Sequence, residues 1–374
     1  MTPAFSMIIN LKAVFLVLRP LGKAYALLMR VRSFLYKNGL LNRYRPLVPV
    51  ISVGNLAMGG SGKTPCVIHL AKLLVNNGFK PAVVSRGYGG KATNSVNIVA
   101  DGASILLDSY LAGDEPRLIA ESVPGAAVLT GKDRRHPCRY ATERLDCDII
   151  LLDDGFQHLR LLRDIDIVVF NASELYKNMH VFPGGFLREP LVALKRSDCF
   201  IISGCTTENQ HKVIRFSRYL SGEHPHTSLF HAQFVPRCYV DPCGETYPLD
   251  HISSPAMAFC GIASPDRFKN SIDELNVQLT NFKSFPDHHR YSKNDVANLQ
   301  SLAEKQRARC LLTTEKDLVK LADSPWSLPI FALRMEITVS PSFDEKILAG
   351  LKKTAFPGLA SLPQEQKASG RGSM

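Results

Sequence analysis

The sequence predicts an α/β fold in two parts: a mostly parallel sheet built around a phosphate-binding loop, as in P-loop NTPases, and a second, smaller α/β domain. Apolar runs typical of buried strands alternate with segments of helical periodicity from residue 47 onward. A glycine-rich stretch ending in Gly-Lys-Thr joins the first strand to the first helix. The length of 374 residues suggests two domains, with one large α/β domain as the alternative, and the hydrophobic content of 45% is ordinary for a globular protein with a sizeable core.

An N-terminal segment, residues 1–45, precedes this pattern. It is predicted to form basic amphipathic helices, separated at Pro20, that lie in a membrane interface. Its apolar stretches are interrupted by Lys12, Arg19, Lys23, Arg30 and Arg32. No uncharged run therefore approaches the roughly 20 residues that span a bilayer. The alternative is an ordinary amphipathic helix packed on the domain.

The stretch from residue 47 to residue 64 predicts a nucleotide site. An apolar strand at 47–53 leads into the loop residues Ala57, Met58, Gly59, Gly60, Ser61, Gly62, Lys63 and Thr64, and a helix follows at 65–77. In such a loop the backbone amides surround a di- or triphosphate, Lys63 reaches the outer phosphates and the Thr64 hydroxyl ligates Mg²⁺. Ala57 stands where the strict pattern has glycine, which weakens the match. A glycine turn before a helix is the alternative.

Two carboxylates extend this prediction to a metal site. The apolar run 147–153 ends in Asp153, and Asp154 follows directly. An acidic strand end serves Mg²⁺ in P-loop proteins. Two acids in a solvated turn are the alternative, but the glycine-rich loop upstream favours the metal.

Domain boundaries follow from changes in this pattern. Residues 46–204 are predicted to form the nucleotide-binding domain, with further strands at 81–86, 126–130, 165–171 and 198–203 and helices at 114–122 and 133–144. Residues 205–250, with several Pro, His and Gly, are predicted to be a hinge. Residues 251–356 are predicted to form the second domain, with strands at 256–262, 277–283, 310–313 and 329–335 and helices at 265–275, 293–307 and 343–353. Residues 357–374 are predicted to be a disordered tail.

Polar residues cluster in the connecting loops. Asp114 and Glu115 open a helix, where acids are also ordinary first-turn residues. A His–Asp pair at Asp287 and His288 permits general base chemistry, although such a pair is more often structural. The loops around Arg86 and around Arg188 and Glu189 would be plain turns if each were taken alone.

Taken together and in order, these motifs resemble the tetraacyldisaccharide 4′-kinase family of lipid A synthesis. The resemblance rests on the segments 53–65, 85–90, 113–116, 153–158, 187–190, 287–288 and 313–317. It implies transfer of the γ-phosphate of ATP, with Mg²⁺, to the 4′-hydroxyl of a tetraacylated glucosamine disaccharide 1-phosphate. It also implies location at the cytoplasmic face of the bacterial inner membrane, with the anionic membrane surface as a partner and neither nucleic acid nor a protein partner implied.

The resemblance assigns roles to individual residues. It implies that Asp114, with His288 as its partner, takes the proton of the sugar hydroxyl. Lys63 is expected to stabilise the transferred phosphate, and Asp153 or Asp154 to hold the metal with Thr64. The residues expected to contact the substrate or to support the site are Arg86, Glu115, Gln157, His158, Arg188 and Glu189.

Two other function classes remain open from the residues alone. A P-loop GTPase or regulatory ATPase would hydrolyse nucleotide without lipid, but the sequence lacks the guanine-specificity pattern Asn-Lys-x-Asp. A non-enzymatic module that binds nucleic acid or membrane would use the formal charge of +11. The nine cysteines form no zinc or C-x-x-C spacing, which favours reduced, buried thiols of the cytoplasm.

Overall fold

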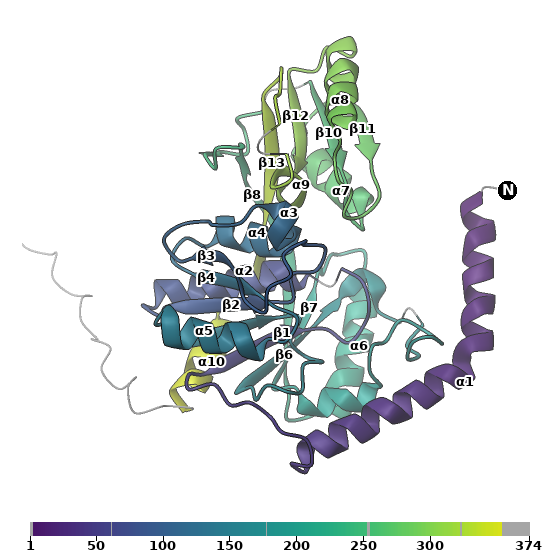
Figure 1. The fold of residues 1–374 in the computed structure, drawn as a ribbon. Coiled ribbons are helices and arrows are strands. Elements are labelled where there is room, and N and C mark those ends of the chain that lie inside the picture. The colour runs from purple at the N-terminus through teal and green to yellow at the C-terminus, as the bar shows by residue number, and fades with distance from the viewer. Residues whose placement is uncertain (1–2, 61, 177, 253–254, 322–323, 354–374) are drawn as a thin grey trace, which may run out of the picture.

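The structure is a computed structural model that describes residues 3–60, 62–176, 178–252, 255–321 and 324–353, with residues 3–12 described by their backbone only. The predicted disordered tail, residues 357–374, and Ser61 of the glycine-rich loop lie outside the described residues. The chain forms two lobes joined by two long strands, with helix α1 along one side of the larger lobe (Figure 1). The predicted α/β class is confirmed by this arrangement.

One sheet of 13 strands runs through both lobes in the order β11-β10-β12-β13-β8-β7-β6-β1-β5-β2-β4-β3, with β9 on β8. The first lobe contains β1 (Val50–Gly54), β2 (Pro81–Ser85), β3 (Asn97–Asp101), β4 (Ala127–Thr130), β5 (Ile149–Asp153), β6 (Ile165–Asn171) and β7 (Cys199–Ser203). All of these pair in parallel except β3, which is antiparallel to β4. Since β1 lies between β5 and β6, the loop after β1 emerges at the centre of the sheet edge, where ligands bind in such folds.

Helices cover both faces of this part of the sheet. They are α2 (Lys63–Asn76), α3 (Ser109–Ala112), α4 (Asp114–Ser122), α5 (Arg135–Arg144) and α6 (Gln210–Glu223), with 3₁₀ turns at Ala172–Glu174 and Leu191–Arg196. The apolar face of α2, with Cys66, Leu70 and Leu74, packs on Ile51 and Val53 of β1 in one buried cluster. This packing fixes the start of α2 directly above the end of β1.

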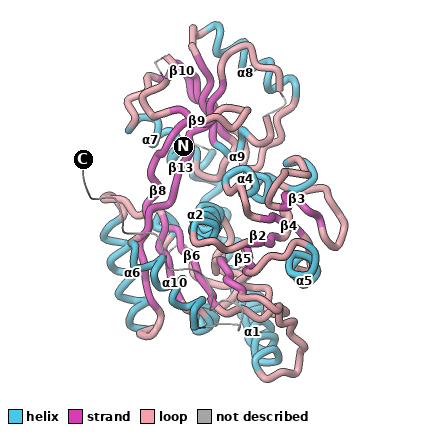
Figure 2. The backbone as a smooth tube through the Cα atoms, turned by 90° about the vertical axis from the view of Figure 1, so that its left-hand side faces the viewer, coloured by secondary structure: helices cyan, strands magenta, loops and turns pink. Residues whose placement is uncertain are grey.

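Two strands connect the lobes, namely β8 (Ser228–Val240) and β13 (Ile330–Val339). The first half of β8 pairs in parallel with β7, and β8 pairs antiparallel with β13 along most of its length. Figure 2 shows both strands running from one lobe into the other. The residues predicted as a hinge, 205–250, thus form α6, β8 and the short β9 (Thr246–Tyr247).

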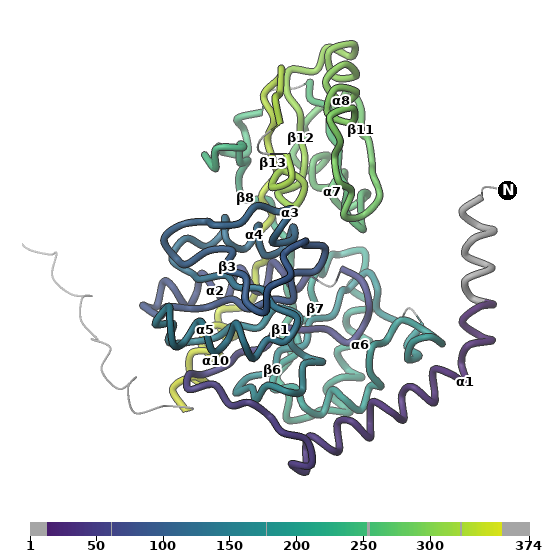
Figure 3. Tube along the Cα trace, viewed as in Figure 1, coloured from purple at the N-terminus to yellow at the C-terminus, as the bar shows by residue number. Residues whose placement is uncertain are grey.

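The second lobe contains β10 (Ala256–Cys260), β11 (Leu279–Ser284) and β12 (Cys310–Thr314), with α7 (Pro265–Glu274), α8 (Lys293–Lys305) and α9 (Glu315–Leu318). Strand β12 lies between β10 and β13, and all three are parallel. The last helix, α10 (Pro341–Lys353), does not stay with this lobe, although the sequence groups it there. Its Phe343, Ile347 and Leu351 join the core of the first lobe, because β13 carries the chain back to it (Figure 3).

Helix α1 (Pro3–Lys37) is a single helix that continues through Pro20, where the sequence predicted a break. Proline within a helix removes one hydrogen bond and bends the axis, and Figure 1 shows α1 changing direction along its length. One side of α1 packs on the first lobe, where Phe15 contacts the Phe186 ring at 4.9 Å between centroids. None of the helices in the described part of the chain is long and apolar enough to cross a membrane.

Candidate active site

The glycine-rich loop connects β1 to α2 with the backbone conformation that a phosphate-binding loop needs. Gly62 adopts φ +77°, and a side chain there would collide with Phe234 and Ser203, at 2.7 and 2.8 Å from an added Cβ. Only glycine therefore fits at the start of α2. The amide of Asn171, at the end of β6, donates a hydrogen bond of 2.7 Å to the carbonyl of Gly60. The N-terminus of α2, which follows this loop, carries the partial positive charge that favours anions.

Ala57 occupies its position without strain. Its backbone pairs with Leu187 in an antiparallel bridge, and Met58 N donates to Phe186 O at 2.8 Å. Ala57 is not among the residues with positive φ. The glycine of the strict motif is therefore not required at position 57, because the backbone here is extended.

The predicted metal residues Asp153 and Asp154 lie at the end of β5, beside the loop. Asp153 is 2% exposed, and its Oδ1 makes no hydrogen bond to any described residue. Burial, together with the charges of Glu115 and Asp154, raises the pKa of Asp153 to about 7. A buried carboxylate with an unused acceptor oxygen suits a hard divalent cation.

Asp154 is held by two cations. Its Oδ1 lies 3.4 Å from Lys63 Nζ, and its Oδ2 accepts a hydrogen bond of 2.6 Å from Arg188. Burial raises the pKa of Asp154, but the charges of Lys63 and Arg188 outweigh burial and leave the pKa below its ordinary value. Lys63, Asp153, Asp154 and Arg188, which are far apart in the sequence, thus meet at one sheet edge.

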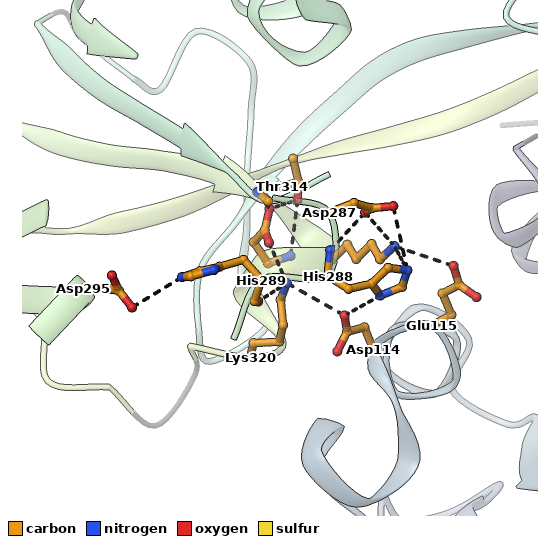
Figure 4. Close-up of polar contacts among 11 residues, drawn as sticks. Asp114, Glu115, Asp287, His288, His289, Asp295, Thr314 and Lys320 are labelled. Carbon is orange, nitrogen blue, oxygen red and sulfur yellow. Dashed lines mark hydrogen bonds and ion pairs between the residues drawn. The ribbon is translucent and has the colours of Figure 1, made fainter. Parts of the chain in front are cut away.

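A second group of site residues forms where the two lobes meet (Figure 4). Asp114 opens α4 in the first lobe, and His288 comes from the loop after β11 in the second. His288 Nδ1 lies 3.2 Å from Asp114 Oδ2. His288 has φ +59°, a conformation that is uncommon for non-glycine residues, and its ring makes an edge contact with Tyr88 at 5.8 Å.

Two lysines of the second lobe surround this pair. Lys320 Nζ lies 3.8 Å from Asp114 Oδ2, and Lys316 Nζ lies 3.1 Å from His288 Nε2. Burial raises the pKa of Asp114, but the hydrogen bond from His288 and the charges of Lys320 and Lys316 lower the pKa below its ordinary value. Asp114 is therefore ionised at neutral pH.

The other predicted site residues have varied surroundings. The side-chain amide of Gln157 donates a hydrogen bond of 2.7 Å to Asn55 O. Glu115 Oε1 lies 3.6 Å from Lys316 Nζ. Burial, with repulsion from Arg134, lowers the pKa of His158 to about 4. The exposed side chain of Arg86 makes no hydrogen bond or ion pair with any described residue.

Glu189 is a buried partner of a structural arginine. Its two carboxylate oxygens accept hydrogen bonds from Arg196 at 3.0 and 3.2 Å. The same guanidinium donates to Phe156 O and lies over the Phe156 ring. Glu189 therefore anchors the loop that presents Arg188, and it does not point into the site.

Sequence reasoning missed four residues that the fold brings to the site. They are Arg134, Asn171, Lys316 and Lys320. Arg134 is 8% exposed, and burial lowers its pKa although the Asp154 charge opposes this. A usable signal was present for Arg134, because it lies shortly after the end of β4 while Asp153 ends β5, and the carboxyl ends of parallel strands share one edge of the sheet. Lys316 stands in the segment 313–317, which the resemblance included without a role.

Comparisons with known proteins agree with this geometry. A family model described as "Tetraacyldisaccharide-1-P 4'-kinase" matches residues 14–352. The proteins named tetraacyldisaccharide 4'-kinase in Desulfotalea psychrophila and Syntrophus aciditrophicus are 42% identical over 329 residues and 41% identical over 356 residues. In each case the match covers 88% of this chain and 94% of the relative.

A solved structure shares the fold. The crystal structure of LpxK from Aquifex aeolicus in complex with ATP superposes with a TM-score of 0.72 at 29% identity, covering 90% of this chain and 99% of that chain. The expected family and α/β class are therefore confirmed. This chain belongs to the tetraacyldisaccharide 4'-kinase family.

Proposed function

We propose that the protein transfers the γ-phosphate of ATP to the 4′-hydroxyl of a tetraacylated glucosamine disaccharide 1-phosphate. The observation that carries this proposal is the contact between Asp114 and His288 across the two lobes. Such a pair supplies a base that can take the proton of a hydroxyl acceptor. A protein that only binds phosphate would not need this base.

The nucleotide is bound by the loop after β1. The backbone amides at the end of the loop and at the start of α2 would bind the β- and γ-phosphates, and Lys63 would move from Asp154 to the outer phosphates. Because the metaphosphate-like transition state spreads negative charge over the phosphoryl oxygens, Lys63 and the start of α2 act by positioning and neutralisation.

The residues at the end of β5 fit Mg²⁺. Asp153 has an unused acceptor oxygen in a buried position, and Thr64 stands at the first turn of α2. Among the described residues no three His, Cys, Asp or Glu side chains form a metal site by themselves. This agrees with Mg²⁺, which is usually held by one or two carboxylates with water and substrate phosphates. We infer that Thr64 with Asp153 or Asp154 holds the ion, which would neutralise charge on the phosphates.

Asp114 takes the proton of the acceptor. As the sugar oxygen forms its bond to the γ-phosphorus, its O–H bond breaks and the proton passes to Asp114. The bond between the γ-phosphorus and the bridging oxygen breaks, and ADP leaves with that electron pair. Arg86, Glu115, Gln157, His158 and Arg188 are proposed to contact the substrate.

Helix α1 is proposed to bind the anionic cytoplasmic face of the inner membrane. Its outward apolar side chains include Val17, 76% exposed, and Leu28, 62% exposed. Basic side chains on the same helix suit anionic headgroups. Since α1 packs against the loops next to Arg188 and Gln157, it would hold the site close to the lipid substrate.

The test is transfer of radiolabel from γ-labelled ATP to a lipid A disaccharide precursor in detergent micelles. We expect labelled lipid that depends on both Mg²⁺ and the acceptor. Release of labelled inorganic phosphate at an equal rate with and without lipid would instead identify a hydrolase. A shift of labelled nucleic acid that survives Lys63→Ala would support the binding-module alternative.

A further inference from the structure

Arg267 makes a second contact between the lobes, beside the glycine-rich loop. It stands in the first turn of α7, at the end of the second lobe that faces the first lobe (Figure 1). Its Nη2 donates hydrogen bonds of 3.1 Å to Asn171 Oδ1 and 3.1 Å to Ser173 Oγ, both in the first lobe. A cation in the first turn is unfavourable to the helix dipole. The local preferences of α7 therefore do not explain this arginine.

The side-chain amide of Asn171 carries this contact to the loop. Asn171 ends β6 and is 6% exposed. Its Oδ1 accepts hydrogen bonds from Arg267, from Ser173 N and from Ser173 Oγ, while its Nδ2 donates one of 2.7 Å to Gly60 O. Because donors converge on the oxygen, the nitrogen is the atom that faces Gly60. A charged donor on the oxygen also polarises the amide and strengthens the donation to Gly60.

The ring of Phe234, in β8, gives Arg267 a second route to the loop. The guanidinium carbon of Arg267 lies 5.6 Å from the ring centroid. The Cζ atom of the same ring lies only 2.7 Å from the position that a Cβ added to Gly62 would take. Gly62 directly precedes Lys63 and caps α2. Arg267 therefore stabilises the ring against which the start of α2 is packed.

Glu174 places a negative charge close to the same loop. Its Oε2 lies 3.3 Å from the position that a Cβ added to Gly59 would take. A carboxylate at this position repels bound phosphates. Burial lowers the pKa of the Arg267 guanidinium and the charge of Glu174 opposes this effect, and an arginine in a protein keeps its charge. Arg267 thus supplies the positive charge that offsets Glu174.

We propose that Arg267 is a positioning residue that links the second lobe to the phosphate-binding loop and raises the affinity of that loop for the phosphates of ATP. It acts through Asn171 on Gly60 and through Phe234 on Gly62, without touching the nucleotide. The inference rests on the proposed binding of ATP by this loop. It gives the second lobe a task in nucleotide binding besides the placement of His288.

Binding of ATP to the full-length protein measures this task without a lipid substrate. Arg267→Met keeps an apolar stem but removes the charge and the donors. Because hydrogen bonds from charged groups are among the stronger ones, we expect the Kd for ATP, measured by isothermal titration calorimetry, to rise by roughly tenfold. Binding should be weakened and not abolished, since Lys63 remains. Lys269→Met, exposed on the same helix, is the matched control and should bind ATP as the unaltered protein does.

Inorganic tripolyphosphate separates an effect through the loop from a direct contact with the nucleotide. It carries a chain of three phosphates without base or ribose, and its affinity is measured by competition with ATP. An effect through the loop weakens ATP and tripolyphosphate by the same factor in Arg267→Met. A loss for ATP alone would place Arg267 against the base or the ribose and would overturn the inference.

Asn171→Ala tests the route itself, because it removes the amide through which Arg267 acts on Gly60. The double variant with Arg267→Met should lose much less affinity for ATP than the product of the two single losses. Losses that multiply would mean that Arg267 does not act through Asn171. An unchanged Kd for ATP in Arg267→Met would also overturn the inference.

The lipid assay distinguishes failure of this inference from failure of the proposed function. In Arg267→Met the KM for ATP should rise with the Kd, while the KM for lipid stays unchanged. A raised KM for lipid with an unchanged Kd for ATP would make Arg267 a substrate contact and contradict the inference. If the unaltered protein labels no lipid, the proposed kinase activity fails, and the measurements with ATP and tripolyphosphate still decide the role of Arg267.

Discussion

At the scale of single residues, the site depends on cations placed against buried carboxylates. Lys63 Nζ lies 3.4 Å from Asp154 Oδ1. Since the same ammonium is needed at the outer phosphates, Lys63→Ala should lower kcat by roughly 10³-fold, about 4 kcal/mol of transition-state stabilisation. Initial rates of phosphate transfer from labelled ATP measure this change in kcat. Lys80→Ala, an exposed lysine before β2, is the control, and near-normal turnover in Lys63→Ala would exclude the phosphate-binding role.

His158 makes stability depend on pH. Burial lowers its pKa to about 4 in the folded protein, whereas an unfolded histidine titrates near 6.5. Below pH 6.5 the unfolded chain binds a proton that the folded chain excludes, so the free energy of unfolding falls as the pH falls from about 6.5 to 4.

We expect this residue to account for about 2 kcal/mol of the stability lost between pH 7 and pH 5. Urea denaturation of the unaltered protein and of His158→Gln at both pH values measures the difference. His226→Gln, at an exposed turn, should leave the pH dependence unchanged. Equal pH dependence in His158→Gln and the unaltered protein would mean that the buried ring does not control it.

At the scale of elements, α1 presents two faces with different tasks. Gly22 packs so closely on the loop around Val181 that a side chain there would lie 2.5 Å from its carbonyl oxygen. Deleting α1 would therefore expose a packed surface as well as remove a membrane contact. Substitutions on the outer face avoid this problem.

Val17→Asp and Leu28→Asp should weaken binding to anionic vesicles and raise the KM for lipid substrate, with ATP affinity unchanged. Each basic residue near an anionic surface contributes about 1 kcal/mol, so vesicle binding of the unaltered protein should decrease with salt. Cosedimentation with vesicles measures both effects. Leu47→Asp, 72% exposed but beyond α1, is the control. Salt-independent binding, or full vesicle binding by both α1 variants, would exclude the interfacial role.

The elements show how far the sequence could predict the structure. Strands such as β6 (Ile165–Asn171) were predicted because a buried parallel strand is a continuous apolar run. Strand β8 was not predicted. Its residues are mostly exposed or partly buried, and they include Pro236, which is more typical of an irregular segment than of a strand. The continuity of α1 through Pro20 was missed, since propensity opposes it. Lys320 and Asn171 reach the site only through tertiary packing, which no local pattern reports.

At the scale of the whole molecule, the two lobes contribute one residue each to the proposed base. Asp114→Ala and His288→Ala should each lower kcat strongly with little change in ATP affinity. The double variant should lose much less than the product of the two single losses, because groups that act as a unit are non-additive. Single-turnover rates of the unaltered protein, the two single variants and the double variant measure this non-additivity. Multiplicative losses would mean that the two residues act independently.

The pH dependence of the rate gives a second comparison of the same variants. Activity falls as the pH falls through the pKa of Asp114, which the hydrogen bond from His288 helps to lower. Removing that hydrogen bond should move the acidic limb of the rate profile to higher pH in His288→Ala. If the acidic limb lies at the same pH in the unaltered protein and in His288→Ala, His288 does not lower the pKa of Asp114.

The path of β8 and β13 has a consequence for gene engineering. The chain leaves the first lobe at Pro236 and returns at Met335, which are cross-strand partners. The second lobe is thus an insertion whose two ends already lie side by side, and a two-residue turn such as Asn-Gly closes paired strands of this kind. Splicing out residues 237–334 would leave α10 and the core of the first lobe together. The shortened gene should encode a protein that still binds ATP but has no His288 with which to act on a lipid.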